Sequence, residues 1–548
     1  MDRLSELPDC TVHHILSYLT AKEAARTSIL STRWKGLYTS FPVLDFHDSY
    51  TYFMEQDLAT INPAMFYHSN LEKVIEIFRE RVSRFIEFVD DSLLRFCQFE
   101  LCMQKFRLLI GLLDVEGSSA ILDRWIGLAI EKKVEELDFN ILAHRRTLYN
   151  LPQTLFSSGE SVTALKLGGC KLEQVPSDAP MRLHSLKSLT LKEACIKEEI
   201  LNKFTSQCPS LEDLFLLDCW GFRDICVSDA CKLKIMSIRE SYNELQSIKV
   251  AVSSLQQFIL GSEYPRGPIV IDMDGCPNLK VLQLSNVAFT DQEFHRLISK
   301  FPLLEDLNVG NCDLLERIAI SSLLLKHLSI GLCFSLKEID VDTPNLLSFC
   351  YDNYPIPVAL INAPCPWKVG VVTQVWGTDT SDTRWYLNIK EFLGASNQIE
   401  YLSFYGHGNK NSFSFDKFRK SSPSPPCEVG NLYLQLEEPS LNYAVFLDGV
   451  LGICYPKTLS VAKSYATNRT SIKWLYDILI NREANCCDFH DIKCWRHYLK
   501  DVKVGSFIPC KDKSPVHMDN LIDAVPELPD GTFCFHLDWC LPIPMQKA

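Results

Sequence analysis

This 548-residue sequence lacks the features that most directly reveal a binding partner. Lysine and arginine form no basic block and the formal net charge is −13, which argues against a nucleic-acid surface and against an anionic membrane face. No apolar run approaches the roughly 18–20 residues that span a bilayer, and the first residues show no charged-then-apolar signal pattern. We therefore expect a protein of the cytoplasm, the nucleus or both, with no nucleic-acid and no membrane partner.

Catalytic motifs are also missing. The sequence contains no Gly-rich phosphate loop, no G-x-S-x-G, no H-E-x-x-H and no paired-cysteine zinc signature. Acidic pairs such as Asp90-Asp91 and Asp340-x-Asp342 are typical of solvated faces or loops. An enzyme is the least favoured class, and we predict no catalytic residue, no metal and no cofactor.

The most informative feature present is a short pattern, L-x-x-L-x-L with apolar substitutes, that returns between Val162 and Tyr351. Its last two apolar positions are two residues apart, so they point to one face of a strand. Copies about 21–25 residues apart match the leucine-rich-repeat period, which predicts an α/β solenoid: a curved parallel sheet with helices and loops outside. The copies start at Val162, Leu186, Leu211, Leu233, Leu255, Leu279, Leu304, Leu325 and Leu346.

Several of the 22 cysteines fit this repeat. We expect reduced thiols, because the chain shows no secretion signal. Four cysteines follow the last apolar residue of a repeat strand by three positions, a place that these repeats give to Asn or Cys, where a buried thiol acts as a small apolar filler. They are Cys170, Cys219, Cys312 and Cys333.

The residue between the two strand leucines should point away from the core and toward a partner. These outward positions are Lys166, Thr190, Phe215, Ser237, Ile259, Gln283, Asn308 and Ser329. Phe215 and Ile259 are the least expected on a solvated face, so we predict them as anchors for a protein target, with Gln283 and Asn308 as further candidates. A competing interpretation places Phe215 and Ile259 under an adjoining helix.

The first 45 residues predict three short helices. Leu7-Pro8-Asp9 opens the first, Ala21 to Arg26 forms the second, and the apolar residues from Ile29 to Tyr38 indicate the third. Leu7-Pro8, Ile15-Leu16-x-x-Leu19 and Leu30-Ser31-x-Arg33-Trp34 together resemble an F-box. In that family the helices dock on a Skp-type linker protein, which joins them to a cullin scaffold.

The F-box resemblance assigns a linker-binding surface. It would be formed or supported by Leu7, Pro8, Ile15, Leu16, Leu19, Leu30, Ser31, Trp34 and Leu37. Leu19, Leu30 and Leu37 could equally belong to the core of the helices, whereas we favour direct contact for Pro8 and Leu16. The adjacent His13 and His14 would point about 100° apart on a helix, which favours solvated positions over a metal pair.

The remaining chain is predicted to divide into four parts. Residues 46–105 form a connection without clear period over 45–70 and then a helical stripe from Asn70 to Phe96 that caps the array. Residues 106–440 form the repeats, with Ser118-Ser119 capping an early helix and an irregular insertion at 352–398. Residues 441–510 and 511–548 follow as a C-terminal module and a patternless tail.

The C-terminal module resembles the FBD domain of plant F-box proteins. The resemblance covers roughly residues 450–510 and rests on Cys486-Cys487-Asp488-Phe489-His490, Cys494, Trp495, His497 and the run from Leu499 to Phe507. The cysteines and histidines could instead hold zinc, but adjacent Cys486 and Cys487 match no familiar zinc spacing. We expect a structural cluster, in an α+β segment that ends the solenoid.

Taken together, the chain resembles a plant F-box/FBD/leucine-rich-repeat protein. The resemblance implies a non-catalytic subunit of an SCF-type ubiquitin ligase that binds a Skp-type linker, a cullin indirectly, and an unknown protein target. Two alternatives keep the binding array: an interaction scaffold outside ubiquitin transfer, and a receptor gated by a small molecule.

Overall fold

The computed structural model describes most of the chain. The described residues are 7–19, 21–47, 68–142, 147–172, 180–242, 244–264, 267–353, 356–372, 381–396, 398–405, 411–422, 424–435, 443–463, 470–481, 494–510, 514–516, 521–522 and 528–540. They belong to two compact units, Met1–Leu279 and Lys280–Ala548. Each unit is α/β.

The first unit begins with three short helices. They are α1 (Asp9–Leu16), α2 (Ala21–Thr27) and α3 (Thr32–Thr39). The third helix starts later than the sequence indicates, because Ser31 takes the N-cap position and leaves Ile29 and Leu30 in the preceding turn. The connection expected at 45–70 lies mostly outside the described residues.

A parallel sheet starts directly after these helices. Strand β1 (Val43–His47) pairs with β2 (Lys105–Gly111). The sheet therefore begins in residues that the sequence analysis placed at the end of the F-box and in the connection after it. The sheet continues through β3 (Glu136–Leu142), β5 (Ala164–Gly168), β7 (Ser188–Lys192), β9 (Asp213–Leu217), β11 (Ile235–Glu240) and β13 (Gln257–Ser262). The repeat leucines alternate into the core, where Leu214 and Leu216 are fully buried.

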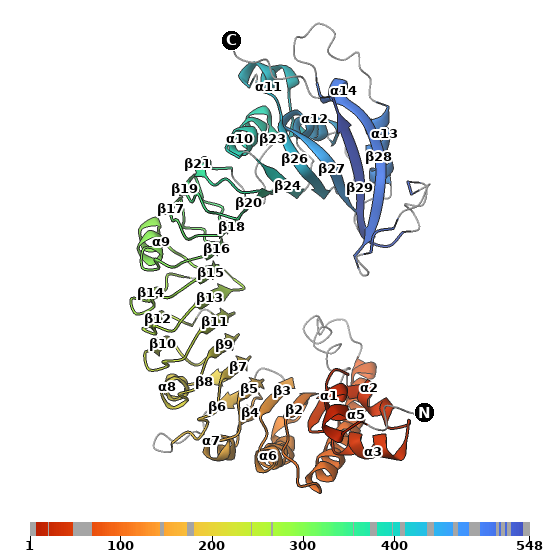
Figure 1. Ribbon diagram of the computed structural model, residues 1–548, viewed down its shortest axis with the longest axis vertical. Helices are drawn as coiled ribbons and strands as arrows, with labels where there is room; N and C mark the ends of the chain where they lie inside the picture. Colours follow the sequence, from red (N-terminus) through yellow and green to blue (C-terminus); the bar gives the residue numbers. More distant parts are fainter. Residues whose placement is uncertain are drawn as a thin grey trace. The chain divides into compact units, whose positions relative to one another are not determined.

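One face of this sheet is covered by helices and small sheets (Figure 1). The helices are α5 (His68–Cys97), α6 (Val115–Glu131), α7 (Gln153–Ser158) and α8 (Glu198–Gln207). The small strands are β4 (Tyr149–Asn150), β6 (Cys170–Leu172), β8 (Cys195–Ile196), β10 (Asp224–Val227), β12 (Ser247–Val250) and β14 (Val270–Asp272). This layer gives the repeat leucines the partner surface that a single repeat cannot provide.

Helix α5 confirms the predicted helical stripe. Phe78, Val82, Val89 and Leu93 are buried along one side of it. Asp90 on the same helix accepts a hydrogen bond from Trp125 Nε1 of α6 at 2.9 Å. Helix α6 is capped by Asp114, whose side chain accepts from Gly117 N at 2.9 Å, so the predicted Ser118-Ser119 cap was placed too late.

In the second unit the main sheet is again parallel over most of its width. It runs through β15 (Val281–Ser285), β16 (Asp306–Gly310), β18 (His327–Gly331), β20 (Ser348–Asn353), β22 (Trp367–Val372), β24 (Ile399–Tyr405), β26 (Cys427–Gln435) and β27 (Cys454–Lys463). Because β22 pairs with β20 on one side and with β24 on the other, the main sheet continues through the described residues of 352–398. The irregular insertion predicted there interrupts only the leucine pattern, because Trp367 and Val369 take the core positions.

The covering layer of the second unit changes along the chain. Strands β17 (Arg317–Ser321), β19 (Glu338–Asp342) and β21 (Val358–Asn362) form a small parallel sheet, and β23 (Ser381–Asp382) pairs with β25 (Asn411–Ser412). The helices are α9 (Asp291–Ile298), α10 (Thr383–Leu393), α11 (Phe415–Ser421), α12 (Tyr443–Ile453), α13 (Thr470–Ile480) and α14 (Trp495–Tyr498). Within the described part of the chain no helix is long and apolar enough to cross a membrane.

The prediction of a patternless tail at 511–548 is wrong. Strand β29 (Gly531–Trp539) lies between β27 and β28 (Leu499–Pro509) and pairs antiparallel with both (Figure 1). Its alternating Phe533, Phe535 and Leu537 are buried. The pattern is a single alternating strand, so it lacks the repeated spacing on which the sequence interpretation relied.

The exits of the main-sheet strands share one backbone conformation. Six of them end in a residue with positive φ, between 48° and 63°, that turns the chain toward the covering layer. The N–H of this residue donates to a carbonyl oxygen of the next strand, as Glu193 N does to Leu217 O at 2.8 Å. The two strands therefore share one more backbone hydrogen bond before the chain turns. The residues are Gly169, Glu193, Asp218, Asn286, Asn311 and Leu332.

Candidate functional site

The three N-terminal helices pack around a small apolar core. Its buried members are Val12, Leu16, Ala24, Trp34, Leu37 and Phe41, with Leu7, Leu19, Tyr38 and Val43 packed partly buried against it. Val43 belongs to β1, so the start of the sheet completes a core that three short helices could not close alone.

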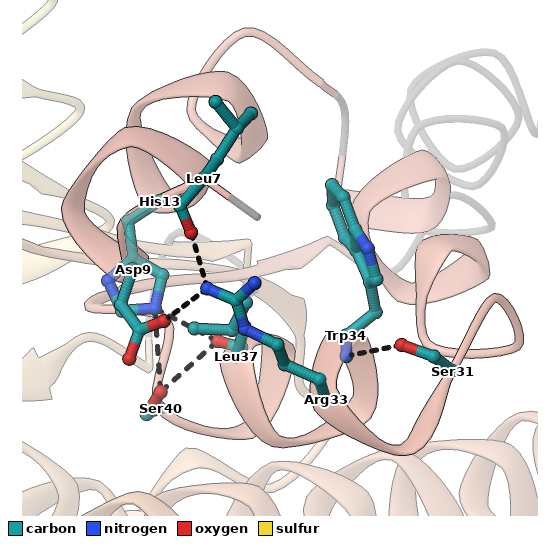
Figure 2. A network of polar contacts seen from close by, with 8 residues as sticks. All are labelled: Leu7, Asp9, His13, Ser31, Arg33, Trp34, Leu37 and Ser40. Atoms are coloured by element: carbon teal, nitrogen blue, oxygen red, sulfur yellow. Dashed lines mark hydrogen bonds and ion pairs between the residues drawn. The ribbon is translucent and has the colours of Figure 1, made fainter. Parts of the chain in front are cut away.

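Polar contacts fix the ends of these helices (Figure 2). Arg33 of α3 donates to the carbonyl oxygen of Leu7 and lies 2.8 Å from the Asp9 carboxylate at the start of α1. Ser31 accepts from Trp34 N at 3.2 Å and caps α3. The Leu30-Ser31-x-Arg33-Trp34 motif is therefore mainly structural: its serine, arginine and tryptophan set the helix start, the helix–helix angle and the core.

His13 is part of this network. Its Nε2 lies 3.1 Å from the Leu37 carbonyl oxygen and 3.4 Å from Ser40 Oγ (Figure 2). The prediction of a solvated position is wrong for His13, because the end of α3 packs against it. His14 is exposed and its ring meets Tyr18 edge-on, with centroids 5.1 Å apart.

The structure separates the predicted linker-binding residues into supporting and surface side chains. Leu16, Trp34 and Leu37 are buried, so the direct contact favoured for Leu16 is wrong: the side chain lies under the surface. Leu7, Ile15, Leu19 and Ser31 are partly exposed, and Pro8 and Leu30 are exposed. Leu30 does not belong to the helix core, which removes the alternative interpretation for this residue.

One surface residue was missing from the sequence prediction. Ile29 is 85% exposed and stands beside Leu30, which is 63% exposed, in the turn between α2 and α3. Two adjacent aliphatic side chains in solvent are unusual on a small domain. The sequence signal was their position just before a capping serine, which excludes both from the following helix.

The predicted target-binding residues lie on the main sheets, on strand positions that alternate with the buried leucines. Phe215 on β9 and Ile259 on β13 are partly exposed. Ser237 of β11 pairs in register with both, lies between them and is buried. Gln283 of β15 is partly exposed, and its register neighbour Asn308 of β16 is exposed. The structure thus places these side chains on faces of the two units, and none of the four is fully buried.

The four cysteines predicted as fillers are all buried. Cys170 and Cys219 occupy the same repeat position as Ala194, and Cys219 Sγ lies 3.3 Å from the Leu191 carbonyl oxygen. Burial raises the pKa of the Cys219 thiol to about 12, so the thiol stays protonated and unreactive at neutral pH.

Metal ligands do not cluster in the described residues, where no group of three or more His, Cys, Asp or Glu side chains could hold an ion. Cys486, Cys487 and His490 of the predicted C-terminal cluster lie outside those residues. Cys494 and Trp495 are buried, and Trp495 Nε1 donates to the Asp448 carboxylate at 2.8 Å. Trp495 therefore anchors α14 to α12.

Comparisons with known proteins match both regions. The F-box domain model matches residues 4–43, which contain α1–α3, and the model described as At1g61320/AtMIF1, LRR domain, matches residues 100–267 and 268–365. The chain is an F-box/LRR-repeat protein. The two matches follow the same order as the helices and the repeat strands, although the parallel main sheet continues beyond residue 365 through β22, β24, β26 and β27.

Relatives of this F-box/LRR-repeat protein occur in Arabidopsis thaliana. At4g00320 and At5g41840, whose names carry the words F-box/LRR-repeat protein, are 26% identical over 66% of this chain and 29% identical over 43% of it. The matches span 65% and 40% of those relatives, less than two thirds of either length. F-box/FBD/LRR-repeat protein At2g04230 is 27% identical over 65% of the chain and 72% of its own length.

Proposed function

We propose that this protein is a substrate-recognition subunit of an SCF-type ubiquitin ligase. The F-box would hold a Skp-type linker and, through it, a cullin, while the repeat sheets hold a protein target. The observation that supports this most directly is the exposed Ile29–Leu30 pair, together with the exposed Pro8, on a domain whose apolar core includes none of them. Those side chains contribute little to folding and remain available to a partner.

The mechanism would be placement rather than chemistry. Holding a target on the same assembly as the ubiquitin carrier raises the local concentration of target lysines near the reacting thioester. This role needs a rigid connection between the docking helices and the repeats. The structure offers one within the first unit, since Val43 of β1 packs into the F-box core and Pro42 O accepts from Gln104 N at 2.9 Å and from Lys105 N at 3.1 Å.

Linker capture tests the proposal. Co-expression with a plant Skp-type protein should yield a stable complex with the wild type, and Ile29→Asp plus Leu30→Asp should weaken it by about 100-fold or more. Each aliphatic side chain buried at an interface contributes about 1.5–3 kcal/mol, and a buried carboxylate adds a desolvation cost. The double variant should fold, because both side chains are already in solvent.

A matched control exists in the second unit. Leu323 and Leu324 are also adjacent, 68% and 47% exposed, so Leu323→Asp plus Leu324→Asp makes the same chemical change away from the F-box. This variant should bind the linker like the wild type. Absence of a wild-type complex would reject the ligase role and favour a scaffold, and equal loss in both double variants would reject the assigned surface.

A further inference from the structure

The outward face of the first unit changes character at β9. One outward-facing residue from each strand pairs in register with its neighbours and forms a row across the sheet. On the strands nearer the F-box, this row consists of Arg107, Asp138, Lys166 and Thr190. On the last three strands the same row carries Phe215, Ser237 and Ile259, and Leu217 lies beside Phe215 on the same face. Apolar side chains therefore appear on the outward face at β9 and β13, where Phe215, Leu217 and Ile259 are partly exposed. Ser237 and the exposed Arg239 lie between them on β11.

Three aromatic residues follow the ends of these strands. Trp220, Tyr242 and Tyr264 each lie three residues beyond the in-register positions Leu217, Arg239 and Gly261. The centroids of the Trp220 and Tyr242 rings are 5.1 Å apart, Trp220 forms a β-bridge with Cys195 of β8, and Tyr264 is 61% exposed. The same position of three successive repeats therefore carries an aromatic ring just beyond the ends of β9, β11 and β13.

The turns that carry these rings are acidic. Within the described residues of 218–222, 240–244 and 262–264, the charged side chains are Asp218, Glu240, Glu244 and Glu263. Asp218 pairs with Arg239 at 2.9 Å, and Glu240 is buried, where it accepts from backbone N–H groups. Glu244 is exposed and accepts a hydrogen bond from Gly221 N at 3.2 Å, and Glu263 is exposed next to Tyr264 in the sequence.

We propose that this surface binds an extended segment of the target protein that carries lysine or arginine between apolar residues. The cation fits the aromatic faces and the exposed Glu244 and Glu263, because rings and carboxylates both attract it. Apolar side chains of the segment fit Phe215 and Ile259, which lie two strand spacings apart, roughly 9–10 Å. This is close to one three-residue turn of a polyproline II segment, in which every third side chain points the same way. The inference rests on the proposed role as a target receptor and names the class of target.

Synthetic peptides test the inference directly. Three 12-residue peptides of sequence (Xaa-Leu-Ser) repeated four times, with Arg, Gln or Glu as Xaa, would be titrated by fluorescence anisotropy into the full chain. The Arg peptide should bind about tenfold more tightly than the Gln peptide, and the Glu peptide most weakly. Glu263→Lys plus Tyr264→Ser should weaken Arg-peptide binding at least about fivefold.

Two further variants separate this site from general attraction to an acidic protein. Asp340→Lys plus Leu360→Ser changes the net charge by the same amount as Glu263→Lys plus Tyr264→Ser, but on two exposed residues of the small sheet in the second unit. This variant should bind the Arg peptide within twofold of the wild type. Phe215→Thr plus Ile259→Thr leaves the net charge unchanged, and threonine is the residue that β7 carries in register with Phe215, at Thr190. This variant should weaken binding of the Arg peptide and of the Gln peptide by the same factor.

Three results would overturn the inference: equal binding of the three peptides, no binding of any, or equal loss in the Asp340→Lys/Leu360→Ser control. Linker capture by the same variants keeps the two proposals distinct. If the chain captures the linker but binds no peptide, the ligase role stands and the proposed peptide-binding surface is rejected. If the chain binds the peptide but captures no linker, the peptide-binding surface stands and the ligase role is rejected.

Discussion

The Arg33 guanidinium lies 2.8 Å from the Asp9 carboxylate and also donates to the Leu7 carbonyl oxygen, which joins the first and third helices of the F-box. Arg33 belongs to the motif that resembles an F-box, and its contacts hold the helices of this domain together. Pro8, Ile29 and Leu30 are exposed, and we propose that they contact the linker. Each prediction below separates a structural contribution from a binding one.

Arg33→Ala should loosen the F-box without touching a partner. A hydrogen bond from a charged donor contributes about 1.5–3 kcal/mol, whereas Asp9→Asn removes an exposed ion pair that contributes up to about 1 kcal/mol. Hydrogen–deuterium exchange over residues 7–41 should accelerate strongly in Arg33→Ala and weakly in Asp9→Asn. Lys35→Ala, on an exposed position of α3, should leave exchange unchanged. Wild-type exchange in Arg33→Ala would contradict the structural role.

Leu332→Asn should stabilise the second unit. Leu332 adopts φ 53°, a left-handed conformation that is unfavourable for a leucine, and Asn286 and Asn311 occupy the same repeat position at similar φ. Relief of this strain is worth roughly 1–2 kcal/mol. Leu332 is 36% exposed, so the loss of its buried apolar surface offsets part of this gain. Urea unfolding should show the gain, and the reverse change Asn311→Leu should show a loss of similar size.

Alkaline pH should destabilise the repeats through their buried thiols. The pKa of the Cys219 thiol rises from 9.0 to about 12 on burial, so the folded state favours the protonated form. The stabilisation is complete below pH 9 and is lost as the pH rises toward 12, with about 1.4 kcal/mol lost at pH 10. Cys219→Ala, which copies Ala194, should show a smaller fall in unfolding free energy between pH 8 and pH 10. An identical fall in both proteins would contradict the assignment.

Phe535→Ala should destabilise the C-terminal region severely. Phe535 is fully buried on β29, between two antiparallel partners, and removal of such a ring costs about 3–5 kcal/mol. Limited proteolysis should then cut β27, β28 and β29 far faster than in the wild type. Asp538→Ala on an exposed position of the same strand should behave like the wild type, and similar cleavage of both variants would show that β29 is dispensable.

Spacing alone determined the repeat architecture of this protein. Leucines two apart within each copy and about 21–25 apart between copies specify stacked strands, because only stacking buries their shared face. The same regularity placed Cys170, Cys219, Cys312 and Cys333 in the core and Phe215 and Ile259 on the outward face. The order of helices and repeats was also readable, because helices and strands have different periods.

Only the tertiary structure decided which apolar side chains are buried and which distant strands pair, because the periodicity of the sequence encodes neither. Leu16 and Leu30 have the same chemistry and both fit the F-box pattern, yet Leu16 lies in the core and Leu30 in solvent, because Ser31 ends the turn and starts the next helix. Strand β29 joins β27 only through antiparallel pairing across about 70 residues, a contact that local sequence does not specify. The Trp220 and Tyr242 rings, from turns of different sequence, come within 5.1 Å only because the register of β9 and β11 aligns those turns.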